Sequence, residues 1–320
     1  MAKIKFLRSG TYTTVQDMGR KEFYGAGIPR SGCLDFRLLY MANALLMNDL
    51  SKSCLEYIHV GPKIEVEQGP IQIAVTGDFA FTIISKTGTI QGVPNRTYTL
   101  VQGDIVDITS SKEKIVGYLS FKNFLNVDTF LNSQSMTPRY NMGHNDGQPF
   151  SAGQELHLSD CELLDSDYQF QITPVFTKTN IIRVFLGPQF DFIENGEELF
   201  TNEFKVSNTR DRIGLGLEGP SFVRKKQHAI VTSIPSPDEG AIQAHPNGKS
   251  FVMCADKATH GGYPHIAVVS KWDYYNLIQM PAGTLIKFTP VEYTEMVPVY
   301  KKFKNLLLDI CHSDNLGKIS

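Results

Sequence analysis

The sequence predicts a mainly β protein with few helices, whose two halves are related by an internal duplication. Its apolar segments are short and rich in Val, Ile, Thr and Phe, and segments 63–77 and 284–293 contain stretches in which apolar and polar residues alternate strictly. Such segments are typical of β-strands. Gly-Pro, Gln-Gly-Asp and Pro-Asn turns separate them, and the helices of an alternating β/α fold are missing. A pair of β-barrels or β-sandwiches is therefore favoured.

The duplication rests on two matches between the halves. Segment 88–95 (GTIQGVPN) matches segment 240–247 (GAIQAHPN) at five of eight positions. Segment 102–109 matches 282–289 at an offset that is 28 residues larger, so the second half carries an insertion between its two matches. In the first half, about 20 extra residues precede Gly61. We expect the functional residues in these two insertions, because polar loops on a rigid scaffold commonly carry function.

The length of 320 residues and the hydrophobic content of 42% allow two domains, each with its own core. We assign residues 1–120 to the first β-barrel domain and residues 179–320 to the second, which ends in a helix. Residues 121–178 match neither repeat and are assigned to an irregular connector.

Two segments have the apolar spacing of helices. In 34–48, apolar residues recur at steps of three and four, with Ser31 available as an N-cap, and 296–310 has the same spacing. The two stripes are Leu34, Leu38, Met41 and Leu45, and Met296, Tyr300, Phe303, Leu307 and Ile310. We interpret both as core contacts.

Charge and cysteine content exclude several classes of partner. The formal net charge of -2 gives no reason to expect binding to nucleic acid or to an anionic membrane. The five cysteines are scattered and form no C-x-x-C pair, and neither a signal peptide nor a membrane span is apparent. We expect a cytoplasmic protein that acts on a small molecule or on another protein.

Segment 13–35 is the first candidate site, with Gln16, Asp17, Arg20 and Asp35 among several glycines. An arginine offers a planar fork for a carboxylate, and glycines let a ligand approach backbone N–H groups. The alternative is a glycine-rich loop with a local Asp17–Arg20 ion pair.

The second half contains two further candidates. Segment 208–220 sets Arg210, Asp211 and Arg212 before a glycine-rich strand, where a solvated ion pair at a strand edge is the alternative. Segment 256–266 (DKATHGGYPHI) contains His260 and His265, but a His-x4-His pair in a Gly-Gly-Tyr-Pro turn lacks the fixed geometry of a zinc site, so no metal is expected. No catalytic Ser or Cys motif is present.

Seven motifs together resemble the biotin-dependent carboxyltransferase family, which includes the C subunit of 5-oxoprolinase, formerly assigned to allophanate hydrolase. They are TVQDMGR, GIPRSGCLD, MANALLMN, CLEYIHVGP, RIGLGLEGP, GAIQAHPNG and DKATHGGYPHIAVV. The resemblance implies two tandem cyclophilin-like β-barrels. It also implies that the chain works in a complex with a B-type protein of the Kip inhibitor class, and with a third, A-type protein.

The resemblance also implies the site residues. Arg20 and Arg212 would bind a carboxylate, Asp17 and Asp256 would position polar groups, and the Gly261–Gly262 backbone would approach the ligand or stabilise an oxyanion. The implied catalytic residues are Asp17, Arg20, Asp256 and Tyr263. The implied substrate-binding residues are Gln16, Asp35, Arg212, Gln243, Thr259, His260, Gly261 and Gly262.

The sequence departs from the family pattern at several positions. Lys257 replaces an arginine, Ala258 a glutamine, His260 a threonine and His265 a lysine. Gly216 stands at a common arginine position, and LNSQSM at 131–136 replaces a Gly-Ser-Arg-Ser-Thr run. Several basic positions that could hold an anion are lost among these changes, which is compatible with a diverged specificity or with a subunit that has kept its fold and lost its activity.

The resemblance leads to one function and two alternatives. The first is the C-type component of a complex that uses ATP to open the lactam 5-oxoproline to glutamate. The alternatives are a non-catalytic protein that antagonises an inhibitor of a histidine kinase, and a biotin-dependent carboxyltransferase of the urea carboxylase or allophanate type. We expect no cofactor on this chain itself, and any biotin would arrive on a partner, because no A-M-K-M-type attachment motif is present.

Overall fold

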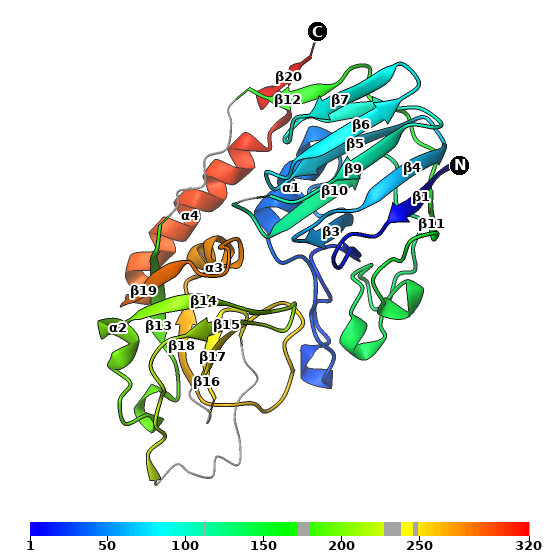
Figure 1. Cartoon of the computed structure of the whole chain (residues 1–320). Coiled ribbons are helices and arrows are strands. Elements are labelled where there is room, and N and C mark those ends of the chain that lie inside the picture. The colour runs from blue at the N-terminus through cyan, green and yellow to red at the C-terminus, as the bar shows by residue number, and fades with distance from the viewer. Residues whose placement is uncertain (112, 172–178, 227–237, 246–248, 320) are drawn as a thin grey trace. The chain divides into compact units, whose positions relative to one another are not determined.

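The computed structural model describes residues 1–111, 113–171, 179–226, 238–245 and 249–319, which form two compact units (Figure 1). The prediction of a mainly β chain with few helices is confirmed. Unit 1 comprises Met1–Arg20, Ser31–Val175 and Leu306–Ser320, and unit 2 comprises Lys21–Arg30 and Phe176–Asn305.

Unit 1 contains two large antiparallel sheets, and a two-stranded sheet near its C-terminus. The six-stranded sheet has the order β11 (Glu155–Leu158), β1 (Ala2–Arg8), β4 (Lys63–Gln68), β9 (Ile105–Ile108), β6 (Phe81–Ser85) and β7 (Gly88–Gly92). The five-stranded sheet has the order β2 (Thr14–Gln16), β3 (Cys54–Ile58), β10 (Val116–Phe121), β5 (Ile71–Thr76) and β8 (Thr97–Leu100).

Both large sheets of unit 1 contribute to one large apolar cluster. In β4, Ile64 and Val66 are fully buried while the intervening residues are partly exposed, which confirms the predicted alternation. β5 is buried along its whole length, because the helix α1 (Phe36–Leu45) packs against it as well. Close packing also explains Gly117: a Cβ there would lie 2.5 Å from the Tyr57 ring.

The predicted helix near residue 40 is α1, but its N-cap differs from the prediction. Asp35, not Ser31, caps the helix, and its carboxylate accepts a hydrogen bond from the backbone N–H of Arg37. Ser31 instead contacts the Thr137 hydroxyl at 2.7 Å. The cap differs because the residue directly before the first helical turn can reach the open N–H groups, and that residue is Asp35.

Unit 2 contains a closed seven-stranded barrel. Its order is β13 (Ile181–Leu186), β18 (His265–Val269), β16 (Ala241–Ala244), β17 (Ser250–Met253), β15 (Gly214–Glu218), β14 (Glu203–Arg210) and β19 (Leu285–Pro290). β13 and β19 are parallel, and the other described pairs are antiparallel. Ile286 and Phe288 of β19 point into the core while their neighbours are exposed, as the alternation in 284–293 predicts.

The helices beyond α1 are α2 (Glu198–Thr201), α3 (Lys271–Ile278) and α4 (Tyr293–Ile310). α4 confirms the predicted C-terminal helix, and Trp272 of α3 stacks on Phe303 of α4 with ring centroids 4.5 Å apart. α3 was not predicted from the sequence, because eight residues with four aromatic or β-branched side chains have little helix propensity. Within the described ranges, no helix is long and apolar enough to cross a membrane.

The two segments of the clearest sequence match differ in their surroundings. β7 forms an edge of the six-stranded sheet, with four of its five residues exposed. β16 lies between β17 and β18 and is buried throughout, and the match continues into residues 246–247, outside the described ranges. Gln91 in β7 is therefore exposed, whereas its counterpart Gln243 in β16 is buried.

The segment predicted as a connector supplies strands to unit 1. β11 pairs with β1, and β12 (Tyr168–Phe170) pairs with β20 (Leu316–Lys318) close to the C-terminus. Two 3-10 turns, Pro138–Tyr140 and Asn145–Gly147, lie between. The segment is irregular over much of its length, yet its strands are part of the sheets of unit 1.

Replacing Lys52 by methionine is expected to lower the free energy of unfolding by about 1–3 kcal/mol. The Lys52 ammonium is 9% exposed and donates hydrogen bonds to the carbonyls of Phe121, Lys122 and Asn123, at 2.9, 2.8 and 3.0 Å. Methionine fills the same space but donates to none of these carbonyls, of which only that of Phe121 keeps a hydrogen bond within the described residues, from the Asn48 amide. Urea unfolding measures the effect, with Lys122→Met as the control, and equal stability of the two variants would contradict the prediction.

Candidate functional site

In unit 1, the carboxylate of Asp17 is the centre of a dense hydrogen-bond network. It accepts bonds from the hydroxyls of Ser133 and Ser135, at 2.7 and 2.5 Å, and from the backbone N–H groups of Gln134 and Gly19, at 2.7 and 2.8 Å. Asp17 thus ties the end of β2 to residues 133–135. A carboxylate with four donors has a fixed orientation and can in turn hold its neighbours in place.

Gln16 and Arg20 contact the same segment. The Gln16 amide donates to the carbonyl of Met136 at 2.8 Å. The Arg20 guanidinium donates to the Ser135 carbonyl at 2.5 Å and to the Thr137 hydroxyl at 3.1 Å, and it is 1% exposed. The structure therefore brings together three of the four site residues predicted in the first half, and residues 133–137 are what joins them.

Asp35, the fourth predicted residue of the first half, lies at the start of α1. Besides capping α1, its carboxylate forms a buried, bidentate ion pair with Arg37, with distances of 2.9 Å to Nε and 2.8 Å to Nη2. These contacts fix the start of α1, so they give Asp35 a structural function.

In unit 2, Arg212 and Asp256 form a buried, bidentate ion pair. Nε of Arg212 lies 2.9 Å from Oδ2 of Asp256, Nη2 lies 3.0 Å from Oδ1, and the two side chains are 1% and 2% exposed. The neighbouring Asp211 instead accepts bonds from the backbone N–H groups of Ile213 and Gly214. The pair links the β14–β15 turn to the loop that follows β17. Asp256 therefore already binds the guanidinium edge with which Arg212 is predicted to bind a ligand carboxylate.

The Gly-Gly-Tyr-Pro turn lies beside Gln243 of β16. Gly261 and Gly262 have φ angles of 68° and 117°, which only glycine adopts readily. A Cβ on Gly262 would lie 2.6 Å from Nε2 of Gln243, so the backbone here passes very close to the amide. Gln243 in turn contacts Nε2 of His265 at 3.0 Å.

Thr259, His260 and Tyr263 complete this loop. The Thr259 hydroxyl donates to the carbonyl of Gly27 at 3.2 Å and lies 2.8 Å from Nδ1 of His260, whose side chain is exposed. The Tyr263 ring lies 4.0 Å from the His245 ring. The contact with Gly27 places residues 21–30, which belong to the first insertion in sequence, beside the second insertion within unit 2.

No group of three or more His, Cys, Asp or Glu side chains among the described residues is placed to hold a metal ion. His265 is buried in the β16–β18 pairing, whereas His260 lies exposed in the loop.

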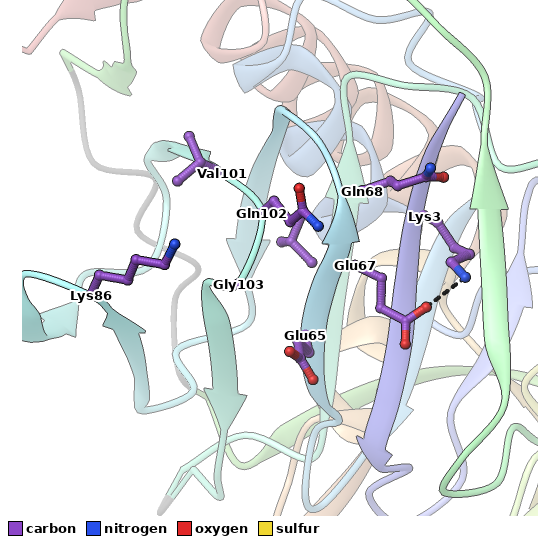
Figure 2. Close-up of a pocket in the computed structure, with 9 residues that line it drawn as sticks. Lys3, Glu65, Glu67, Gln68, Lys86, Val101, Gln102 and Gly103 are labelled. Atoms are coloured by element: carbon purple, nitrogen blue, oxygen red, sulfur yellow. Dashed lines mark ion pairs between the residues drawn. The ribbon is translucent and has the colours of Figure 1, made fainter.

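A polar surface pocket of about 810 Å³ lies elsewhere in unit 1, beside the end of β4 (Figure 2). Lys3 at its edge pairs with Glu67 at 2.7 Å and with Glu155 at 3.1 Å. Its lining is Lys3, Glu65, Val66, Glu67, Gln68, Lys86, Val101, Gln102 and Gly103, and it contains none of the predicted site residues.

Residues 26–290 match the family described as the carboxyltransferase domain, subdomain A and B. The chain belongs to this family. The match covers most of both units and includes the segments around Asp35, Arg212, Asp256 and the Gly-Gly-Tyr-Pro turn. The family resemblance inferred from the motifs is therefore confirmed.

Several known members of the family are similar over most of this chain. The C subunit of Escherichia coli 5-oxoprolinase is 27% identical, over 91% of this chain and 92% of its own length. Urea amidolyase of Lachancea kluyveri is 28% identical over 89% of this chain but only 17% of its own length. The solved structure of TTHA0988 superposes with a TM-score of 0.79 at 28% identity, over 90% of this chain and about half, 56%, of that longer one.

The part that residues 133–137 play in the site was not predicted from the sequence. The available signal was the polar run SQSMT at 133–137, most of which lies in the segment that departs from the family pattern. Its hydroxyls donate hydrogen bonds to Asp17, and its carbonyls accept hydrogen bonds from Gln16 and Arg20. Each of these contacts joins residues that are more than 110 positions apart. Sequence spacing alone gives no access to such contacts.

The stability of the protein is expected to fall as the pH drops below about 6.5, and His265→Gln should flatten this dependence. Burial lowers the pKa of His265, whose side chain is 3% exposed. His265 therefore binds a proton more tightly in the unfolded chain than in the folded chain. The stability that this difference contributes is complete above the pKa of the unfolded chain, and it is lost as the pH falls through the pKa of the folded chain. Chemical unfolding between pH 5 and 8 measures this, with His260→Gln as the matched control. If the stability of the His265→Gln variant depended on pH as that of the unmodified chain does, the assignment of this dependence to His265 would be wrong.

Proposed function

We propose that this chain is the C-type component of an ATP-dependent 5-oxoprolinase, which opens the lactam of 5-oxoproline to give glutamate. It would act in the cytoplasm and in complex with a B-type partner and an A-type partner. Water adds to the lactam carbonyl and the C–N bond breaks, which leaves a new carboxylate and a free amine.

The observation that carries this proposal is the reciprocal coverage of the relatives. The alignment with the C subunit of 5-oxoprolinase runs over 92% of that protein, whereas the alignment with urea amidolyase runs over 17% of it. The C subunit of 5-oxoprolinase is thus similar to this chain over almost its whole length. The larger relative shares a segment of a much longer protein.

The local geometry is compatible with chemistry at an amide. The backbone at Gly261–Gly262 has no side chains and is held in the positive-φ region, so its N–H groups are open to a ligand oxygen. The buried Arg212–Asp256 pair and the Asp17 network each fix one polar segment rigidly. Fixed donors of this kind stabilise developing charge better than mobile ones, because they need no reorganisation during the reaction.

The test is to coexpress the chain with its B-type and A-type partners and to assay glutamate formation from 5-oxoproline. We expect formation that requires ATP and all three proteins. A complex that assembles but forms no glutamate would refute the proposal.

A second candidate is transfer of a carboxyl group carried by biotin on a partner protein. The similarity to urea amidolyase, 28% over 313 residues, favours it. Supplying the complex with a biotinylated carrier protein, bicarbonate, ATP and urea distinguishes the two. Urea-dependent ATP hydrolysis without glutamate formation from 5-oxoproline would favour carboxyl transfer.

A further inference from the structure

Lys257 is a cation of unit 2 that, unlike Arg212, has no carboxylate in contact among the described residues. It directly follows Asp256, and its side chain is 6% exposed. Its ammonium lies 5.0 Å from the centre of the Tyr24 ring, above the ring face. Among the described residues, no oxygen accepts a hydrogen bond from it and no carboxylate lies within ion-pair distance. The ammonium has three donors and is not itself among the fully buried polar atoms, so a small ligand can reach it, and charges within proteins are ordinarily paired.

The neighbouring charges do not neutralise Lys257 by direct contact. Glu239 and Asp238 attract its ammonium from beyond ion-pair distance, and Lys271 and Arg30 repel it. The Glu239 carboxylate is already bound by Lys271. An anion that reached Lys257 would therefore gain an attraction that no carboxylate among the described residues supplies in contact.

Arg212 fits this role less well. Both ends of its fork are held by Asp256, and both side chains are buried. A ligand carboxylate would have to displace Asp256, which would leave that carboxylate buried and without its partner. Lys257 can accept an anion without breaking an ion pair, and the Tyr24 ring would cover one side of it.

We propose that Lys257 is the residue of unit 2 that binds the carboxylate of a small-molecule ligand, an inference that rests on the proposed function for the identity of that ligand. It replaces Arg212 in the role predicted from the sequence. The ligand class is a small amide or lactam that carries a carboxylate, and the matching neutral compound should bind without any contribution from Lys257.

Calorimetric titration without ATP tests the proposal, on the full chain and on the chain with its B-type partner. The probes are 5-oxoproline, glutamate and N-acetylglycine. Each is compared with a neutral compound that lacks its carboxylate, which for 5-oxoproline is 2-pyrrolidinone. Lys257→Met should weaken binding of the preferred carboxylate at least about tenfold and leave its neutral match unchanged. Lys257→Arg should bind it within about threefold of the unmodified chain, because a guanidinium also pairs with a carboxylate.

The control is Lys205→Met, which removes an exposed lysine of the same unit and should leave every affinity unchanged. The proposal is overturned if Lys257→Met binds all the carboxylates as the unmodified chain does, if it weakens the neutral compounds equally, or if no carboxylate binds the chain in either form. These outcomes are separate from a failure of the proposed function. That failure appears as absent glutamate formation, whereas Lys257-dependent binding of another carboxylate in the panel would still support the inference.

Discussion

Asp256→Ala is expected to lower the free energy of unfolding by about 3–5 kcal/mol, the largest stability effect we predict for a single substitution. The variant takes the bidentate carboxylate away from Arg212, whose guanidinium is 1% exposed and has little access to water. The cost arises from a buried charge that loses its counter-ion. It does not measure the net value of the pair, because forming the pair also removed both charges from water.

Two controls separate this cause from a general loss of packing. Glu218→Ala breaks the exposed Lys205–Glu218 pair, 2.6 Å long, and should change stability far less than Asp256→Ala does, because water screens an exposed pair. The double variant Arg212→Leu/Asp256→Leu removes both charges and should recover much of the loss seen in Asp256→Ala. Urea unfolding measures all three. The explanation fails if Asp256→Ala is no less stable than Glu218→Ala.

Asp17→Ala is expected to lower the rate of glutamate formation by the assembled complex about 100-fold. The substitution removes the acceptor for two hydroxyls and two backbone N–H groups, so the segment 133–137 is released from β2. Arg20 is held by the carbonyl of Ser135 and the hydroxyl of Thr137, and it would move with them. A displacement of about 1 Å in a site is enough for an effect of this size.

Ser133→Ala is the matched comparison, since it removes one donor to Asp17 and keeps the carboxylate. It should cost only a few fold in rate. The stability of Asp17→Ala, measured by urea unfolding, should fall by about 2 kcal/mol or more, because buried donors to a charged group lose their acceptor. An Asp17→Ala protein that is as stable and as active as the unmodified chain would show that the network positions nothing.

The β-strand content was accessible from sequence because strand alternation is a local property. β4 and β19 show it directly, with buried Ile64 and Phe288 among exposed neighbours. Both long helices, α1 and α4, were predicted by their apolar spacing. The short helix α3 was not, because its burial beside the barrel, and not its own propensity, stabilises it: Asp273 of α3 pairs with Arg183 of β13 at 2.7 Å.

The candidate site was predictable in part. Its segments have local sequence patterns, whereas the contacts between the segments arise only on folding. The motifs pointed to segments in which Asp17, Arg20, Arg212 and Asp256 take part in polar clusters. Their partners were not predictable. A sequence shows that Asp211 adjoins Arg212, but only the pairing of β15 with β17 brings Asp256, 44 positions away, to the guanidinium.

The sequence by itself determined the class of fold, the family and the segments that carry polar chemistry, because alternation, turn residues and motifs are encoded within a few neighbouring positions. Only the tertiary structure decided which charges are already neutralised. Arg212 is paired and Lys257 is buried without a carboxylate in contact among the described residues, and this difference depends on through-space distances that chain folding sets. These distances are the reason why we propose Lys257 rather than Arg212 as the anion-binding residue of unit 2.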